Sequence, residues 1–259
     1  METIIDAHVH PYLTAEQNSS LNFFGKTVSP QKFAENLRRA GVTRFAGSVI
    51  SASGSIRSFE QIHELNRAAM DLKEIFGDRY TPGVHIHPDY PEESIRELEW
   101  FHKQGGWLIG ELVWYQMGYQ TYLQSAGRKI FQRAQELHMA VCVHPTTDED
   151  IGELARSFPG LPVIAAHPRD KQTFSIRLEQ MKKYPNLYQD LSGTGIFRDG
   201  LLRYGIDRVG SSRFLYGSDY PICNPGMYVA AVRYEELTDA ERRAVFSENF
   251  MRLESASKP

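Results

Sequence analysis

Two histidines, His8 and His10, stand one residue apart at the end of the short apolar segment 3–7. In a β-strand, residues i and i+2 point to the same face, so these two imidazoles are expected to lie side by side. Paired neutral imidazoles on a rigid strand suit a transition metal such as zinc. Taken alone, the pair is equally consistent with two unrelated polar side chains at a strand end.

The same arrangement, an apolar segment that ends in a histidine, glutamate or aspartate, recurs along the chain. Further candidates of this kind are Glu111, His144, His167 and Asp219. Each has an ordinary explanation when taken singly, such as capping a carbonyl, pairing with an arginine or capping the next helix. Imidazoles and carboxylates are costly to bury unpaired, and a divalent cation that takes deprotonated ligands removes this cost. Together, the candidates predict a metal site.

Short apolar strands that alternate with amphipathic helices are predicted to position these residues. The strands are expected at about 3–10, 44–51, 80–87, 107–113, 139–144, 162–167, 186–192 and 213–219. Near-continuous apolar strands are typical of a parallel sheet that is buried on both faces. Eight β/α units in 259 residues predict an α/β fold, a single-domain (β/α)₈ TIM barrel over residues 1–259. In such a barrel the carboxyl ends of all strands meet at one rim.

An open doubly wound sheet is the competing architecture. That fold usually binds its ligand through a glycine-rich turn after the first strand, whereas here the first strand ends in His-Val-His. The helices are expected at about 30–40, 58–76, 91–103, 122–138, up to 158, 174–184 and 197–209. A loop rich in proline, glycine and tyrosine is expected after the eighth strand, followed by a final helix from 238. Ser29 can cap the first of these helices and Gly41 can end it, and Thr238 with Glu241 forms a capping box at the last.

Composition and charge exclude several other classes of protein. The formal net charge is −3, so no strongly basic field favours a nucleic acid partner. The N-terminus has no signal-peptide pattern, and no apolar run approaches the ~18 residues that span a membrane. The two cysteines, Cys142 and Cys223, do not make a disulfide framework, which favours a cytoplasmic setting. The partner expected is a small-molecule substrate, and exposed aromatic residues permit a homodimer.

Several segments together resemble the amidohydrolase superfamily, most closely its "amidohydrolase 2" branch of metal-dependent hydrolases and decarboxylases. The resemblance rests on Ile5-Asp6-Ala7-His8-Val9-His10, Val143-His144-Pro145, Ala166-His167-Pro168, Leu215-Tyr216-Gly217-Ser218-Asp219-Tyr220-Pro221 and the tail 246–253. It implies that His8 and His10 are the metal ligands of strand one and that His144 and His167 are those of strands five and six. It also implies that Asp219 is the strand-eight aspartate that binds metal and moves the proton.

One departure from the superfamily pattern lies in the fourth strand. Members with two metals often bridge them through a carboxylated lysine there, and this strand contains no lysine. Gly110-Glu111 instead resembles the glutamate of TatD-type hydrolases. Glu111 is therefore expected to be a bridging or a terminal ligand, and both one and two metal ions remain open. Zinc is the expected ion, with manganese or iron(II) as alternatives.

The resemblance implies a hydrolase that uses a metal-activated water to cleave a small amide, lactone or ester. In this interpretation Asp219 takes the proton of the water and passes it to the leaving group, while His144 or His167 alternates between ligand and oxyanion stabiliser. Three alternatives remain. They are a metal-dependent decarboxylase of a small carboxylic acid, a TatD-like phosphoesterase or nuclease, and a metal-binding or ligand-binding module without catalytic activity.

Residues that could bind the substrate are expected in the loops on the same rim. The segment 12–28 is long enough to act as a lid. Trp114, Tyr115 and Tyr119 could form an aromatic wall, or they could belong to a loop that only packs on its neighbours. Arg169 could grip a carboxylate or phosphate, or it could form a surface salt bridge instead. His87 is expected at most to face the substrate or to support the site.

Overall fold

The computed structural model describes residues 2–14, 17, 24, 27–50 and 56–257. Its centre is a sheet of eight strands in the order β1 to β8, and each strand pairs in parallel with the next one along the chain. The strands are β1 (Ile5–Asp6), β2 (Arg44–Ser48), β3 (Tyr80–Val84), β4 (Leu108–Leu112), β5 (Ala140–Val143), β6 (Val163–Ala165), β7 (Leu187–Asp190) and β8 (Phe214–Leu215).

The first and last strands meet and close the sheet into a barrel. The backbone N–H of Ala7 donates to the carbonyl of Tyr216 at 2.8 Å, and that of Asp219 donates to the carbonyl of His8 at 2.8 Å. Val9 and Tyr220 form a further parallel bridge. The predicted (β/α)₈ barrel is therefore confirmed.

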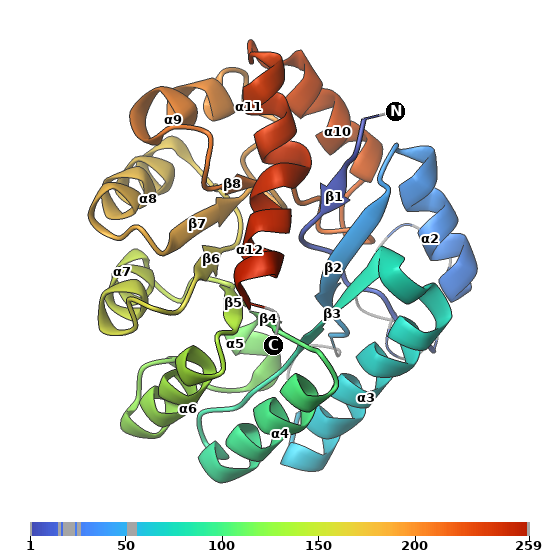
Figure 1. Cartoon of the computed structure of the whole chain (residues 1–259), viewed down its shortest axis with the longest axis vertical. Coiled ribbons are helices and arrows are strands. Elements are labelled where there is room, and N and C mark those ends of the chain that lie inside the picture. Colours follow the sequence, from blue (N-terminus) through green and yellow to red (C-terminus); the bar gives the residue numbers. More distant parts are fainter. Residues whose placement is uncertain (1, 15–16, 18–23, 25–26, 51–55, 258–259) are drawn as a thin grey trace.

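Helices surround the strands as an outer ring, which Figure 1 shows as a continuous progression of colour around the barrel. Those that follow the first five strands are α2 (Pro30–Arg39), α3 (Phe59–Phe76), α4 (Pro91–Lys103), α5 (Trp114–Met117), α6 (Ser125–Glu136) and α7 (Asp148–Ser157). The remaining helices are α8 (Lys171–Lys183), α9 (Leu201–Val209), α10 (Pro225–Tyr234), α11 (Asp239–Arg243) and α12 (Asn249–Ser257), with a π-helical segment Ala244–Glu248 between the last two.

The core has two parts, which follow from the two faces of the strands. One large cluster packs the outward-facing strand residues against the helices. A smaller cluster fills the barrel itself with compact side chains such as Ala46, Ala140 and Ala166. Trp107 and Phe250, whose ring centroids lie 5.5 Å apart, close the amino-terminal end of the barrel together with Leu253. Helix α12 supplies the last two of these residues and lies across that end of the barrel (Figure 1).

The predicted helix ends are confirmed where the capping chemistry was specific. The Ser29 hydroxyl accepts from the backbone of Lys32, and both hydrogen bonds of the capping box between Thr238 and Glu241 are present.

Two expectations about the elements were wrong, and a third was incomplete. Helix α10 was expected to be a loop because its first residues are Pro225 and Gly226, but Asn224 caps it and a proline fits the first turn. The final helix is present, but the π-helical segment interrupts it, and there the carbonyl of Val245 accepts a hydrogen bond from the backbone N–H of Tyr216. Strand β1 is shorter than expected, so His8 and His10 lie just beyond its end.

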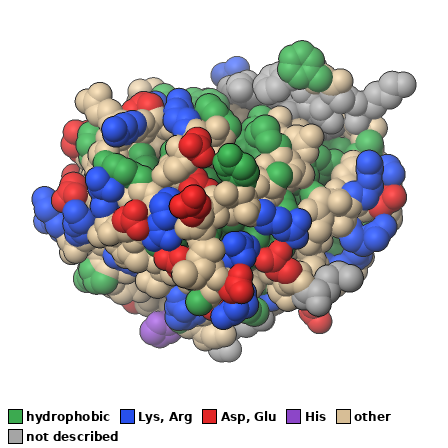
Figure 2. Space-filling view, turned by 90° about the horizontal axis from the view of Figure 1, so that it is seen from above, with side chains coloured by type: hydrophobic (Ala, Val, Ile, Leu, Met, Phe, Trp, Pro, Cys, Tyr) green, Lys and Arg blue, Asp and Glu red, His purple; other side chains and the backbone are tan. Residues whose placement is uncertain are grey.

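The predicted lid, segment 12–28, lies largely outside the described residues. No helix in the described part of the chain is long and apolar enough to cross a bilayer. On the face of the molecule in Figure 2, positive and negative side chains are interspersed, and no continuous band of one sign crosses it.

Candidate metal centre

The structure brings all the predicted metal-binding side chains together at the carboxyl ends of the strands. His8 and His10 follow β1, Glu111 lies in β4, and the others follow β5, β6 and β8. His8, His10, Glu111 and Asp219 are buried, whereas the side chains of His144 and His167 are 26% and 10% exposed. We call this set the rim cluster; its members are His8, His10, Glu111, His144, His167 and Asp219.

One part of the rim cluster, the first subsite, gathers around the Oε2 atom of Glu111. The Nε2 atoms of His8 and His10 lie 3.2 Å apart, and they lie 3.3 Å and 3.4 Å from this oxygen. The Oδ1 atom of Asp219 lies 3.4 Å from Nε2 of His10 and 3.8 Å from Nε2 of His8. The prediction that His8 and His10 share a face is confirmed.

The other part, the second subsite, gathers around the Oε1 atom of the same glutamate. Nδ1 of His144 lies 3.1 Å from this oxygen, and Nε2 of His167 lies 3.4 Å from it. The two carboxylate oxygens of Glu111 therefore face two different sets of donors. Glu111 with His8 and His10 forms one group of ligand atoms that lie within 4.8 Å of one another, and Glu111 with His144 and His167 forms another. Each group is close enough to bind one ion.

In the neutral imidazoles of His8 and His10, hydrogen bonding places the single ring proton on Nδ1, so Nε2 carries no proton. Nδ1 of His10 donates to the carbonyl of Ser48 at 3.1 Å, and Nδ1 of His8 donates to Asp190 at 2.8 Å. In the neutral rings, both Nε2 lone pairs therefore point at each other across 3.2 Å. Two facing lone pairs need a positive charge between them, so the donor set fits a divalent cation.

The charges of the site support the same conclusion. Burial opposes charging His167, but the neighbouring Glu111 carboxylate outweighs it and raises the pKa of His167 to about 9. Burial likewise opposes ionisation of Glu111, yet the imidazoles around it hold the pKa of this carboxyl well below its ordinary value. The cluster thus holds negative charge that attracts protons, and metal ions compete for the same positions.

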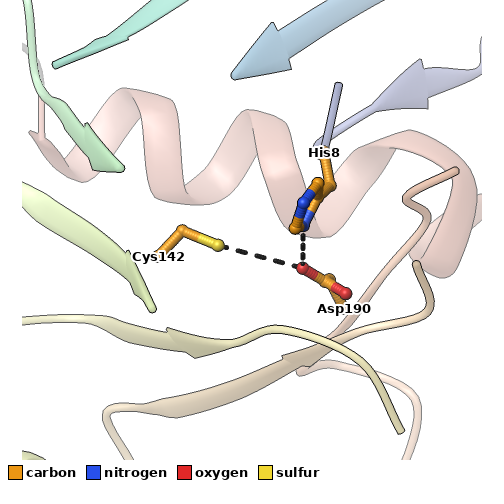
Figure 3. Close-up of side chains that lie close together, drawn as sticks. All are labelled: His8, Cys142 and Asp190. Atoms are coloured by element: carbon orange, nitrogen blue, oxygen red, sulfur yellow. Dashed lines mark hydrogen bonds and ion pairs between the residues drawn. The ribbon is translucent and has the colours of Figure 1, made fainter. Parts of the chain in front are cut away.

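Behind the first subsite, the carboxylate of Asp190 contacts the far side of His8. Its Oδ2 atom lies 2.8 Å from Nδ1 of His8 and 3.9 Å from the sulfur of Cys142, and Figure 3 shows both side chains pointing at it. These three residues also lie within ligating distance of one another. Burial raises the pKa of the Cys142 thiol to about 12, so the sulfur remains a protonated hydrogen-bond donor at neutral pH.

A second buried carboxylate, Asp6, ties the first strand to the last. It accepts the hydroxyl of Ser218 at 2.5 Å, and the backbone N–H groups of Ser218 at 2.9 Å and His8 at 3.2 Å. Burial is the main cause that raises the pKa of Asp6 to about 7. Because Asp219 follows Ser218, these bonds fix Asp219 relative to His8.

Two members of the rim cluster adopt a strained backbone. His167 and Asp219 both have φ of 61°, in the left-handed region that residues with a side chain rarely occupy. A neighbouring glycine leaves room for one of them: a Cβ on Gly193 would lie 2.2 Å from Nδ1 of His167. Such strain is typical of functional sites, where the surrounding structure holds the side chain in one position.

The residues predicted to bind the substrate differ in how well they are placed. The ring of Tyr115 packs edge-on against His144 with centroids 5.3 Å apart, and Trp114 packs against Tyr115. His87 uses both ring nitrogens on the protein, since Nε2 bonds the carbonyl of Met117 and Nδ1 accepts from the backbone of Asp89. It therefore supports the loops and has no free nitrogen for a substrate.

Arg169 lies two residues beyond His167 with an exposed side chain, and its own carbonyl accepts from the Arg198 guanidinium. Within the described part of the chain, its guanidinium forms no ion pair. The surface salt bridge that was expected as the alternative role of Arg169 is therefore not present among these residues.

Asp190 and Ser192 are contacts of the site that the sequence left without a role. Asp190 ends β7, so the rule that found the other candidates, a polar residue at the carboxyl end of a strand, applies to it as well. The role of Asp190 depends on its distance from His8. That distance is set by the geometry of the barrel and cannot be read from the sequence.

Comparisons with known proteins agree with the barrel fold. The profile of a family described as amidohydrolase matches residues 5–253. No curated protein matches the chain significantly. The structure of 2,6-dihydroxybenzoate decarboxylase from Rhizobium is 14% identical to this chain, with a TM-score of 0.74 over 98% of this chain and 99% of that chain.

Two further solved structures are similar to the chain. The structure of 5-carboxyvanillate decarboxylase from Sphingomonas paucimobilis is 14% identical, with a TM-score of 0.73 over 98% of this chain and 99% of that one. That of dihydroxybenzoic acid decarboxylase from a Polaromonas species, with bound manganese and the inhibitor 2-nitroresorcinol, is 16% identical. Its TM-score is 0.72 over 100% of this chain and 98% of the other. At these identities, the likeness establishes the fold.

Proposed function

This chain belongs to the amidohydrolase family, and on that premise we propose that it is a metal-dependent hydrolase of a small-molecule amide, lactone or ester. The rim cluster would hold two divalent cations, one in each subsite. Zinc and manganese both suit imidazole and carboxylate ligands, and the bound manganese of the Polaromonas enzyme is a reason to test manganese beside zinc.

The observation that carries the proposal is the position of Glu111 between the two subsites. Its Oε2 atom faces His8 and His10, while its Oε1 atom faces His144 and His167. One carboxylate shared by two sets of imidazoles is an arrangement that suits a pair of cations. Paired cations are used in hydrolytic sites to hold both the attacking and the leaving oxygen. The likeness of Glu111 to the TatD-type glutamate stays a prediction.

Cations held in these subsites would lower the pKa of a water and polarise a carbonyl oxygen of the substrate. Residues of the chain would transfer the proton and orient the substrate. The Asp219 carboxylate, at the edge of the first subsite, would accept a proton from the attacking water and deliver it to the leaving group. His144, the most exposed histidine of the rim cluster, would orient the substrate oxygen together with the ring of Tyr115.

Decarboxylation of a small carboxylic acid is the second candidate. The similar structures that carry a named activity support this alternative better than they support hydrolysis, because each of the three is a decarboxylase. In that reaction Asp219 would take up a proton from solvent and deliver it to the carbon atom that loses carbon dioxide. The two candidates share the rim cluster and differ in whether water enters the reaction.

The test is an activity panel on protein that has been reconstituted with zinc and, separately, with manganese. Esters, lactones and amides form one half of the panel, and hydroxylated aromatic acids form the other half. Hydrolysis products that carry ¹⁸O from labelled water support the proposal, and release of carbon dioxide without hydrolysis replaces it with the second candidate. Chelated protein and an Asp219→Asn variant are the matched controls, and turnover that persists in both overturns metal-dependent catalysis at this site.

A further inference from the structure

We propose that Asp190 and Ser192 are positioning residues that fix the ring orientation and tautomer of one histidine in each metal subsite. This inference rests on the proposed metal site and adds to it two residues that touch neither substrate nor cation. The observation behind it is that one short segment at the end of β7 contacts His8 of the first subsite and His167 of the second.

The partners of Asp190 show that its carboxylate serves only as an acceptor. Its Oδ1 atom accepts from the backbone N–H of Ser192 at 3.0 Å, the Ser192 hydroxyl at 2.6 Å and the backbone N–H of His167 at 3.2 Å. Its Oδ2 atom lies 2.8 Å from Nδ1 of His8. A carboxylate oxygen accepts, so Nδ1 of His8 carries the proton and its Nε2 lone pair is free for a cation.

The hydroxyl of Ser192 extends the same control to the second subsite. Because its proton goes to Asp190, the oxygen accepts from neighbouring groups, and Nδ1 of His167 lies 3.0 Å away. Nδ1 of His167 therefore carries a proton, and Nε2 is left to face Glu111 at 3.4 Å. Nδ1 of His8 also lies 3.0 Å from the same hydroxyl.

The environment leaves these groups little freedom to rearrange. Asp190 and Ser192 are completely buried, and a Cβ on Gly217 would lie 3.2 Å from that of Ser192 and 2.9 Å from that of His8. Histidine ligands whose second nitrogen donates to a carboxylate are held in one orientation and become stronger ligands. The segment thus couples the geometry of the two subsites.

The variant Asp190→Asn makes the inference testable because its amide has one acceptor and one donor. Three donors converge on the position of Oδ1, so the amide oxygen is expected to stay there and the NH₂ group to face His8. An N–H at that position forces Nδ1 of His8 to accept, which moves its proton to Nε2, the nitrogen that must bind the cation. Loss of a ligand partner of this kind lowers metal affinity by about 10–100-fold.

The experiment measures zinc affinity by competition with a chromophoric chelator, for the full chain and three variants. Asp190→Asn is expected to weaken the first subsite by about 10–100-fold, and Ser192→Ala to weaken the second subsite by about 10-fold. Cys142→Ala is the matched control. It removes the thiol that donates to Oδ2 of Asp190 and leaves the hydrogen bond between Asp190 and His8 in place. Its zinc affinity is expected to equal that of the original chain, even if the thermal midpoint falls.

A nuclear magnetic resonance measurement on the zinc-loaded protein separates positioning from packing. The proton on Nδ1 of His8, shared with a carboxylate, is expected to give a downfield signal that Asp190→Asn abolishes and Cys142→Ala retains. Equal zinc affinity in all variants, or an equal loss in Cys142→Ala, overturns this inference while the metal site stands. Failure of the original chain to bind zinc or manganese overturns the proposed function, and this inference with it.

Discussion

At the scale of single residues, the chemistry depends on which atom of each side chain faces the cluster. Glu111 offers one oxygen to each subsite, and the histidines present lone pairs because their other nitrogens are engaged. Asp219 lies at the edge of the first subsite and is buried, with 7% of its surface still exposed, so it is near the proposed cations and keeps a small contact with solvent. Its role is therefore separable from that of the histidines.

The variant Asp219→Asn is expected to retain bound metal and to lose activity by about 10²–10⁴-fold, because an amide cannot accept and return the proton. The histidines and Glu111 still supply most of the ligands. Elemental analysis and turnover measured on the same preparation test this prediction. Full activity with full metal content would remove Asp219 from the proton path.

Gly193→Ala is expected to disturb the second subsite, because the added methyl group would lie 2.2 Å from Nδ1 of His167. The ring would have to move away from Glu111, which weakens metal binding. Gly200→Ala is the matched control, since Gly200 also has positive φ, at 73°, but has nothing within 4 Å of the new methyl group. The control variant should lower the free energy of unfolding by about 1 kcal/mol, because an alanine at positive φ is strained. Its zinc affinity should be unchanged.

At the scale of elements, the sequence was sufficient to predict which polar residues stand at the carboxyl ends of the strands. Hydrophobic segments with polar carboxyl ends were sufficient to place His144, His167 and Glu111 together, because a parallel barrel collects those ends on one rim. The role of Asp190 could not be predicted from the sequence. It depends on the position of strand β7 relative to the ring of His8, which only the folded structure shows. Helix α10 was missed because tertiary packing and an asparagine cap outweigh the proline and glycine at its start.

The capping box of helix α11 gives a prediction at this scale. The Arg203 guanidinium and the Thr238 backbone hold the pKa of Glu241 at about 2, against an ordinary value of 4.5. A carboxyl with a lowered pKa stabilises the folded state above pH 4.5, and this contribution disappears as the pH falls towards 2.

Glu241→Gln keeps the cap and removes the charge, so it should lower the free energy of unfolding by roughly 1 kcal/mol at pH 7. The difference from the original chain should shrink below pH 4.5, the ordinary pKa of a glutamate. Urea denaturation at several pH values measures it. Asp207→Asn is the control, because this more exposed partner of Arg203 should contribute almost nothing. A Glu241→Gln effect that does not depend on pH would contradict the ion-pair explanation.

At the scale of the whole molecule, the barrel separates stability from function. Helix α12 and Trp107 close the amino-terminal end, and the rim cluster lies at the opposite end. Residues from five strands meet in that cluster, so a bound cation links elements that are distant in the sequence. Metal binding should therefore stabilise the entire fold.

Chelation is expected to lower the thermal midpoint of the loaded protein. A ligand at 100 times its Kd adds about 2.7 kcal/mol to the free energy of unfolding. In a chain of this size, that corresponds to a shift of about 5–10 °C. Differential scanning calorimetry with and without chelator tests the prediction, and identical midpoints would contradict it.

The stabilisation of the fold by bound metal should also depend on pH. The pKa of His167 determines whether this stabilisation increases or decreases as the pH rises. In the metal-free protein its pKa is raised to about 9 from 6.5, so its protonated form stabilises the fold below pH 6.5 and this contribution is lost by pH 9. A metal ion must displace that proton. The difference in thermal midpoint between loaded and metal-free protein should therefore widen as the pH rises from 6 towards 9, and a difference that narrows would contradict the prediction.

The most direct test of the central claim, that Glu111 joins two cation subsites, is the metal stoichiometry of reconstituted protein by elemental analysis. The original chain should hold two equivalents of zinc or manganese, and a His8→Ala/His10→Ala double variant should keep one equivalent, in the second subsite. One equivalent in the original chain would contradict the bridging role of Glu111. No metal in either protein after reconstitution would contradict the metal centre altogether.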